Sequence, residues 1–151
     1  MISKKTKYGL CALMCLAKKY KQEPVLISDL AKSEAIPKKF LESILLELKN
    51  KGILQSKKGK GGGYSLSRDP REIMIGQILR ILGGPLAPVP CVSQSAYHPC
   101  EECCDEKTCG IRIVMKEVRD AMADILDKTS LADILDKARD ASGKGVFDYI
   151  I

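Results

Sequence analysis

The sequence predicts a mostly helical protein with a small β-hairpin, namely a winged helix-turn-helix domain followed by a long dimerisation helix. Three observations favour this fold class. The first half has helical spacing of apolar residues and then a Gly-rich hairpin, and the second half has a helix with coiled-coil spacing. Between them lies a loop that holds five of the seven cysteines. We therefore expect a DNA-binding unit, a thiol-rich loop and an oligomerisation helix, in that order.

Length and composition are typical of a globular protein. A chain of 151 residues with 45% apolar and 29% charged residues can bury a core and is not of the disordered type. No apolar run approaches the ~20 residues that a membrane span requires, and the N-terminus lacks the apolar stretch and cleavage site of a signal peptide. We expect a cytoplasmic protein without membrane contact, where clustered cysteines more often bind metal or sense redox state than form disulfides.

The net charge of +6 is divided unevenly along the chain. Residues 1–71 carry 16 Lys and Arg against 6 Asp and Glu, whereas residues 72–151 carry 9 against 13. A basic front half favours binding to a polyanion, and an acidic back half avoids it. The alternative is a solvated lysine-rich surface without a nucleic-acid partner.

Three helices are expected before residue 52. The first covers residues 6–20, and the residues on its inner face are Leu10, Leu13, Met14, Ala17 and Tyr20. Ser28 is expected to cap a short second helix, which buries Leu30 and Ala31. The third begins at Pro37 and ends at Gly52, and its buried stripe is Leu41, Ile44, Leu45 and Leu48.

The outward residues near the start of the third helix are the candidates for the DNA major groove: Lys38, Lys39, Glu42 and Ser43. Glu42 is the base-reading candidate, because a carboxylate accepts a hydrogen bond from the cytosine amino group but is repelled by phosphate. The third helix is therefore the predicted recognition helix.

A hairpin wing is predicted after this helix, from two strand-like stretches around a Gly-rich tip. Lys57, Lys58 and Lys60 supply positive charge. Gly61, Gly62 and Gly63 let the backbone approach phosphates or the minor groove. The tip is not a Walker A loop, because no Gly-Lys-Ser/Thr follows.

A fourth helix is predicted at residues 73–82, and Gly83-Gly84-Pro85 ends it. Residues 83–109 then form a proline-rich loop without periodicity, and a loop of this length is usually functional or disordered. Its thiols argue for a function, because clustered thiolates suit iron–sulfur clusters, zinc or copper(I). The candidate ligands are Cys91, Cys100, Cys103, Cys104 and Cys109.

From residue 110 to 127 the apolar residues alternate steps of four and three, which is the period of a coiled-coil seam. The seam consists of Ile111, Met115, Val118, Met122 and Ile125. Two copies in a homodimer would cover each other's seam; the alternative is that this stripe packs on its own domain. Ser130 and Asp133 predict a capping box that opens a last helix.

These features divide the chain into four parts. Residues 1–82 are the expected DNA-binding domain, 83–109 the sensor loop, 110–141 the dimerisation helix and the C-terminal helix, and 142–151 a tail. The acidic residues of the loop lack apolar neighbours that would form a catalytic pocket, so we expect a regulator and not an enzyme.

Four features together resemble the IscR-type regulators, also called the Rrf-two family. They are Tyr8-Gly9-Leu10, Phe40-Leu41-Glu42, the wing that ends in Gly61-Gly62-Gly63-Tyr64-Ser65-Leu66, and the cysteine loop before a long helix. The resemblance covers residues 1–136. It implies a homodimeric bacterial transcription regulator that binds a double-stranded operator. Members with the cysteine loop hold an iron–sulfur cluster and report on cluster supply, iron, nitric oxide or redox state.

The resemblance also implies a ligand set. Cys109 and Cys103 fall on the last and middle cluster cysteines, but the usual spacing to the first reaches Tyr97. Arg112 stands where some members carry a His ligand, and Lys5 and Lys7 stand where others carry an acidic one.

A set of four thiolate ligands would account for these departures from the family pattern. Its members are Cys91, Cys100, Cys103 and Cys109, with Cys104 spare or in place of Cys103. The implied cofactor is an iron–sulfur cluster, with 2Fe-2S preferred to 4Fe-4S.

Two other functions stay open. One is a winged-helix regulator with structural zinc, in which Cys100 and Cys103 form the knuckle. The other is a thiol redox switch, although no thioredoxin-like sheet is predicted to support it. His98 is expected to be a bystander in the loop. Cys11 and Cys15, four residues apart on the first helix, are expected to be packing residues.

Overall fold

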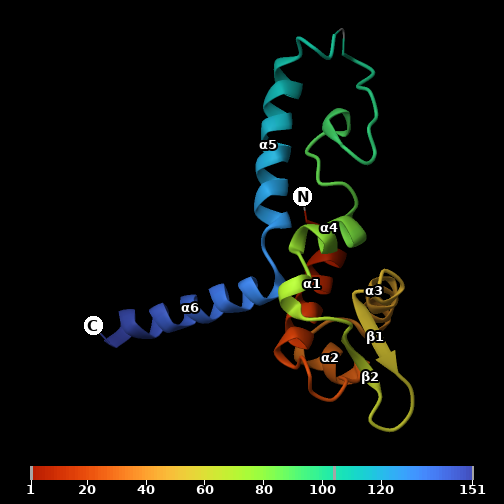
Figure 1. The fold of residues 1–151 in the computed structure, drawn as a ribbon, viewed down its shortest axis with the longest axis vertical. Coiled ribbons are helices and arrows are strands. Elements are labelled where there is room, and N and C mark those ends of the chain that lie inside the picture. The colour runs from red at the N-terminus through yellow and green to blue at the C-terminus, as the bar shows by residue number, and fades with distance from the viewer. Residues whose placement is uncertain (1, 104, 151) are drawn as a thin grey trace.

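The computed structural model describes residues 2–103 and 105–150, with residues 144–150 as backbone only. Within these residues the chain forms six α-helices, one two-stranded sheet and two short 3-10 helices (Figure 1). The elements are α1 (Lys4–Lys18), α2 (Ile27–Ser33), α3 (Lys38–Asn50), β1 (Leu54–Lys57), β2 (Gly63–Leu66), η1 (Pro70–Glu72), α4 (Ile75–Gly83), η2 (Pro90–Val92), α5 (Gly110–Asp127) and α6 (Leu131–Ile150).

Helices α1 to α4 and the hairpin share one apolar core. The four residues of the predicted stripe of α3 are all buried in it, so the helical spacing identified them correctly. The prediction for the first helix was partly wrong, because Leu10 and Met14 are only half-buried and Tyr20, also half-buried, lies two residues beyond the end of α1. This helix packs against α3, α4 and α6 at once, so its buried face is wider than one stripe. The face consists of Thr6, Gly9, Ala12, Leu13, Leu16 and Ala17.

The short second helix begins two residues earlier than expected. Ile27 is its first residue and Leu26 is in the capping position without a side-chain hydrogen bond, so the prediction that Ser28 caps α2 was wrong. Ser28 is exposed in the first turn instead. Pro37 directly precedes α3, and Gly52 follows it with a φ of +78°, a left-handed conformation that glycine adopts without strain.

The predicted wing is present as an antiparallel hairpin, in which Leu54 pairs with Leu66 and Lys57 with Gly63. Its base is tied to the strand-like residue before α2. The N–H of Val25 donates to Tyr64 O at 2.9 Å, and the N–H of Tyr64 donates to Val25 O at 2.8 Å. This pair of backbone hydrogen bonds fixes the orientation of the wing relative to α2 and α3.

The second half of the chain extends away from the helix-turn-helix body (Figure 1). Helix α5 and the loop that contains η2 run beside each other, and α6 projects to the side. The capping box at the start of α6 is confirmed: Ser130 N–H donates to Asp133 Oδ2 at 2.8 Å, and Asp133 N–H donates to Ser130 Oγ at 3.1 Å. Helix α6 continues through Ile150, where the sequence predicted a tail from residue 142. The glycines of this stretch lower helix propensity without forbidding helix.

No helix among residues 2–103 and 105–150 is both long and apolar enough to cross a membrane.

Candidate DNA interface and cysteine cavity

The start of α3 presents its polar residues to solvent. Lys38, Lys39, Glu42 and Ser43 are all exposed, as the sequence predicted. The ring of Phe40 meets the ring of Tyr8 edge to face, with centroids 5.6 Å apart, which packs the start of α3 against α1. At the other end of the helix, Lys5 of α1 pairs with Glu47 at 2.6 Å. The outward face of α3 is therefore held in place from behind.

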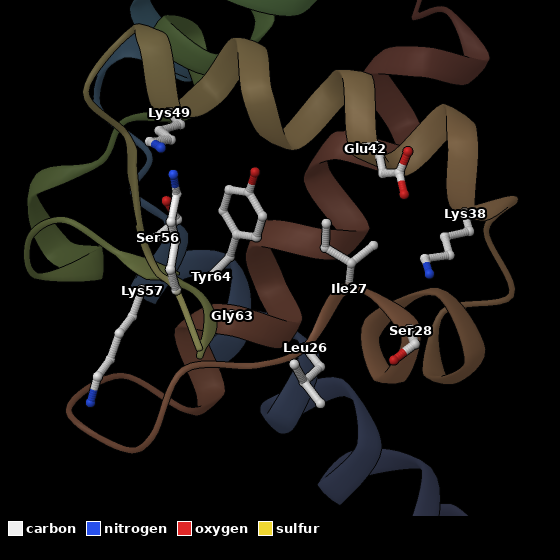
Figure 2. A pocket seen from close by; sticks show the side chains of 11 residues that line it. Leu26, Ile27, Ser28, Lys38, Glu42, Lys49, Ser56, Lys57, Gly63 and Tyr64 are labelled. Carbon is white, nitrogen blue, oxygen red and sulfur yellow. The ribbon is translucent and has the colours of Figure 1, made fainter. Parts of the chain in front are cut away.

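A groove of about 440 Å³ lies between α3, the wing and the start of α2 (Figure 2). Its lining residues are Lys38, Glu42 and Lys49 from α3, Ser56, Lys57, Lys58, Gly63 and Tyr64 from the wing, and Leu26, Ile27 and Ser28 from the start of α2. Glu42 is the one carboxylate among these residues, and four lysines line the same groove. A groove with this excess of positive charge suits the phosphates of a nucleic acid.

The groove brings together some of the predicted DNA-binding residues and not others. Lys38, Glu42, Lys57, Lys58 and Gly63 line it. Lys39 and Ser43 lie outside it on the exposed face of α3. Lys60 and Gly61 are exposed at the tip of the wing, whereas Gly62 is buried against the backbone of Lys57 and Gly59.

Sequence reasoning missed Lys49 and Tyr64 as groove residues. Lys49 is seven residues after Glu42, which is two helical turns, so the spacing alone identifies it as a neighbour on the same face. Tyr64 enters the groove because β2 pairs with Val25, and no local pattern predicts that pairing. Figure 2 shows its ring pointing from the wing toward α3.

A second cavity, of about 430 Å³, lies where the loop meets the start of α5. Four thiols line it: Cys91, Cys100, Cys103 and Cys109. These are the cysteines of the expected all-thiolate set, and their role as ligands stays a prediction. Cys104 lies outside the described residues. His98, Glu102, Glu106 and Arg112 also line the cavity.

Three separate segments supply these thiols. Cys91 is in η2, and Cys109 directly precedes α5 and accepts the first helical hydrogen bond, from Ile113 N–H at 3.1 Å. Cys100 and Cys103 belong to one turn, in which Cys103 N–H donates to Cys100 O at 3.3 Å. Partial burial, together with the neighbouring Cys109 thiol, raises the pKa of Cys103. All six described cysteines are free thiols.

Within the described residues, no three His, Cys, Asp or Glu side chains form a site for a single metal ion. Four soft thiols nevertheless line the same space, together with His98, Glu102 and Glu106. Thiolates of this number are the usual ligands of an iron–sulfur cluster. The residues present therefore fit such a group by their chemistry.

Two arginines of α5 bind the loop. Arg112 Nε donates to Cys91 O at 3.3 Å, and Arg119 Nη1 donates to Val92 O at 2.5 Å. Arg112 is also 4.0 Å from the carboxylate of Glu106, which accepts a hydrogen bond from the Tyr97 hydroxyl. That hydrogen bond raises the pKa of Tyr97. One side of α5 is thereby occupied by the loop.

A neighbouring face of α5, about 100° around the helix from Arg112 and Arg119, is apolar and open to solvent. Ile111 is 69% exposed and Ile125 is 65% exposed, and Val114, Val118 and Met122 are exposed between them. Met115, which the sequence placed in the seam, is half-buried and lies between Ile111 and Arg119 around the helix, and its place in a dimer seam stays a prediction. Val114 is exposed beside Val118. We call Ile111, Val114, Val118, Met122 and Ile125 the exposed row of α5.

A three-helix unit with a hairpin wing and a lysine-rich groove on its third helix defines a winged helix-turn-helix regulator of transcription. The sequence model of the Rrf2 family, described as an iron-dependent transcriptional regulator, matches residues 2–137. The chain belongs to the Rrf2 family.

Known relatives agree with this assignment. An rrf2-like HTH-type transcriptional regulator of Rhodobacter capsulatus is 42% identical over 138 residues, which cover 89% of this chain and 92% of the relative. The structure of CymR, described as the global cysteine regulator of B. subtilis, has a TM-score of 0.74 and 32% identity, and the match covers 89% of this chain and 95% of CymR. The structure of T. potens IscR has a TM-score of 0.73 and 28% identity, and the match covers 93% of this chain and 90% of IscR. Proteins of this family are DNA-binding regulators and not enzymes.

Proposed function

We propose that this chain acts in the cytoplasm as a homodimer that binds a double-stranded operator, and that an iron–sulfur cluster in the cysteine cavity sets its affinity for DNA. The observation that carries the proposal is that thiols from three separate segments, η2, the turn at residues 100–103 and the start of α5, line one cavity. The family description names iron, which supports iron as the metal.

Cys91, Cys100, Cys103 and Cys109 are the residues that would hold the cluster. When bound, the cluster supplies covalent links between these segments and a charge that responds to iron supply, nitric oxide or redox state. The protein supplies the rest: Arg112 and Arg119 hold the backbone of η2 against α5, so that Cys91 stays beside the other thiols.

The position of the loop suggests how ligation reaches the DNA-binding domain. The loop leaves α4 at Gly84 and enters α5 at Gly110. Ordering or releasing the loop would change the angle between α5 and α4. If α5 carries the dimer contact, this angle sets the distance between the two recognition helices, and a regulator of this kind must match that distance to its half-sites.

The dimer contact in this proposal is the exposed row of α5. An apolar row of this length is costly to leave in water, and a second copy of the same helix covers it with a matching row. The DNA contact is the groove together with the exposed face of α3. In this arrangement Lys38, Lys39, Glu42 and Ser43 enter the major groove, while the wing lysines meet phosphates or the minor groove.

The test is to purify the protein without oxygen, to assay iron and acid-labile sulfide, and to record its visible absorption. Brown protein with both elements supports the cluster, whereas colourless protein with one bound zinc would replace it with the structural-zinc alternative. Reconstituted and metal-free protein are then compared on one panel of operators at one salt concentration. Equal affinities over the whole panel would reject the sensing role.

A further inference from the structure

Leu46 is an apolar residue on the outward face of the recognition helix. Helix α3 contains five Leu and Ile residues, all described, and Leu46 is 51% exposed. The other four, which are Leu41, Ile44, Leu45 and Leu48, are each 0% exposed. The core therefore does not account for an apolar side chain at this position.

The position of Leu46 on the helix relates it to the base-reading residues. With about 100° between successive residues, Leu46 is four residues after Glu42 and three after Ser43, so it lies one turn beyond them on the same face. Lys49, three residues further on, lines the groove with Glu42. Leu46 consequently lies near the middle of the exposed face, on the side of α3 away from its buried stripe.

We infer that Leu46 contacts the methyl group of a thymine and so helps to determine which operator is bound. This inference rests on the proposed function, in which α3 enters the major groove. Among the four bases, thymine alone presents an apolar group there, its C5 methyl, and an apolar side chain is the partner that recognises it. A polar residue would serve phosphates or base edges better, so a leucine at the centre of this face selects for the methyl group.

Helix geometry also predicts where that thymine lies. One helical turn advances about 5.4 Å, and successive base pairs are about 3.4 Å apart. The thymine should therefore be one or two base pairs from the pair that Glu42 contacts. In a dimer it appears once in each half-site, at symmetric positions.

The test removes the methyl group and nothing else. An operator is first selected from a randomised duplex library with wild-type protein, and each thymine is then replaced in turn by deoxyuridine, which pairs identically. We expect one symmetric thymine whose replacement weakens wild-type binding by about fourfold per half-site, the equivalent of one buried methylene. Leu46→Ala should bind the unmodified operator correspondingly more weakly and should no longer distinguish thymine from deoxyuridine at that position.

Leu46→Met is the matched control, because it keeps an apolar side chain of similar size and reach and should retain the discrimination. The side chain is half in solvent, so all three proteins should have the same unfolding midpoint. If no thymine replacement weakens binding by wild-type protein, or if Leu46→Ala still discriminates at the same position, the inference is wrong while DNA binding itself stands. If wild-type protein binds no duplex at all, the proposed function and this inference fail together.

Discussion

Arg80 of α4 and Asp127 at the end of α5 form a two-pronged ion pair, with Nη1–Oδ1 at 2.5 Å and Nη2–Oδ2 at 2.9 Å. Gly76 lies against the pair, where a Cβ would overlap the Asp127 carboxylate and come within 3.1 Å of Arg80 Nη1. Beside it, Ile75 N–H donates to Thr129 O at 2.8 Å. The C-terminal end of α5 is therefore fixed to α4, the helix from which the cysteine loop departs. In the proposed function, these contacts are the connection between the loop and the DNA-binding domain.

We expect Asp127→Asn to weaken this connection. Both partners are partly exposed, so the free energy of unfolding should fall by no more than ~1 kcal/mol at neutral pH. Reconstituted and metal-free protein should also differ less in their affinity for the same operator, so that the ratio of the two affinities moves toward one. Urea unfolding and operator titrations measure the two effects. Asp124→Asn is the control, because Asp124 pairs with Lys128 within the same helix and should leave the ratio unchanged.

The same pair predicts a dependence on pH. The hydrogen bonds from Arg80 hold the pKa of the Asp127 carboxyl below its usual value. A carboxyl whose pKa is lower in the folded state stabilises the fold above the unfolded pKa of ~3.9, and this contribution is lost as the pH falls through the folded value. The stability difference between wild type and Asp127→Asn should therefore be present at pH 7 and vanish in strong acid. A difference that is constant over this range would contradict the assignment.

Val118→Glu should prevent dimerisation, because it places a charge in the middle of the exposed row of α5. A buried unpaired carboxylate costs several kcal/mol, more than a short helical seam supplies. Sedimentation at micromolar concentration should show a dimer for wild type and a monomer for the variant. Lys116→Glu, on the same helix but outside the row, should remain dimeric. A monomeric wild-type protein would remove the basis for the dimer.

Lys58→Ala should weaken binding to every duplex by a similar factor, because a lysine on the wing that meets a phosphate reads no sequence. The slope of log affinity against log salt should become shallower by ~1. Lys137→Ala removes the same charge from α6 and should change neither quantity. An unchanged slope for Lys58→Ala would exclude a phosphate contact of the wing at this position.

Glu42→Ala should relax the choice of operator and not simply weaken binding. A carboxylate that accepts from a cytosine amino group discriminates by ~1–3 kcal/mol, and its removal also takes away repulsion from nearby phosphates. Affinity for the selected operator should fall, while affinity for operators changed at the contacted pair should be retained or rise. Equal losses across the operator panel would place Glu42 away from the bases.

Cys91→Ser should abolish iron and sulfide retention, and so should the same change at Cys100, Cys103 or Cys109, because each removes one ligand of the proposed set. Cys11→Ser and Cys15→Ser, on half-buried positions of α1 far along the chain from the cavity, should stay brown. His98→Ala should also keep its absorption. If His98→Ala loses its colour while one of the four cysteine variants keeps it, then His98 is a ligand in place of that cysteine.

Several elements could be predicted from the sequence because their cause is local. The buried stripe of α3 follows from spacing at three and four residues, and Gly52 ends that helix because it adopts a positive φ. The capping box needs only Ser130 and Asp133, three residues apart. The five cysteines of the loop stand out in the sequence by their density, and four of them line one cavity in the structure.

Tertiary structure decided the features that depend on which segments meet. Tyr64 reaches the groove because its backbone pairs with Val25, and Arg80 meets Asp127 across 47 residues of chain. The loop returns onto α5, where Arg112 and Arg119 donate to its carbonyl groups. Apolar periodicity shows that a helix has a face to bury, but both sides of α5 carry apolar residues. Which side faces the loop and which is left open depends on contacts between segments distant in sequence, and those exist only once the chain has folded.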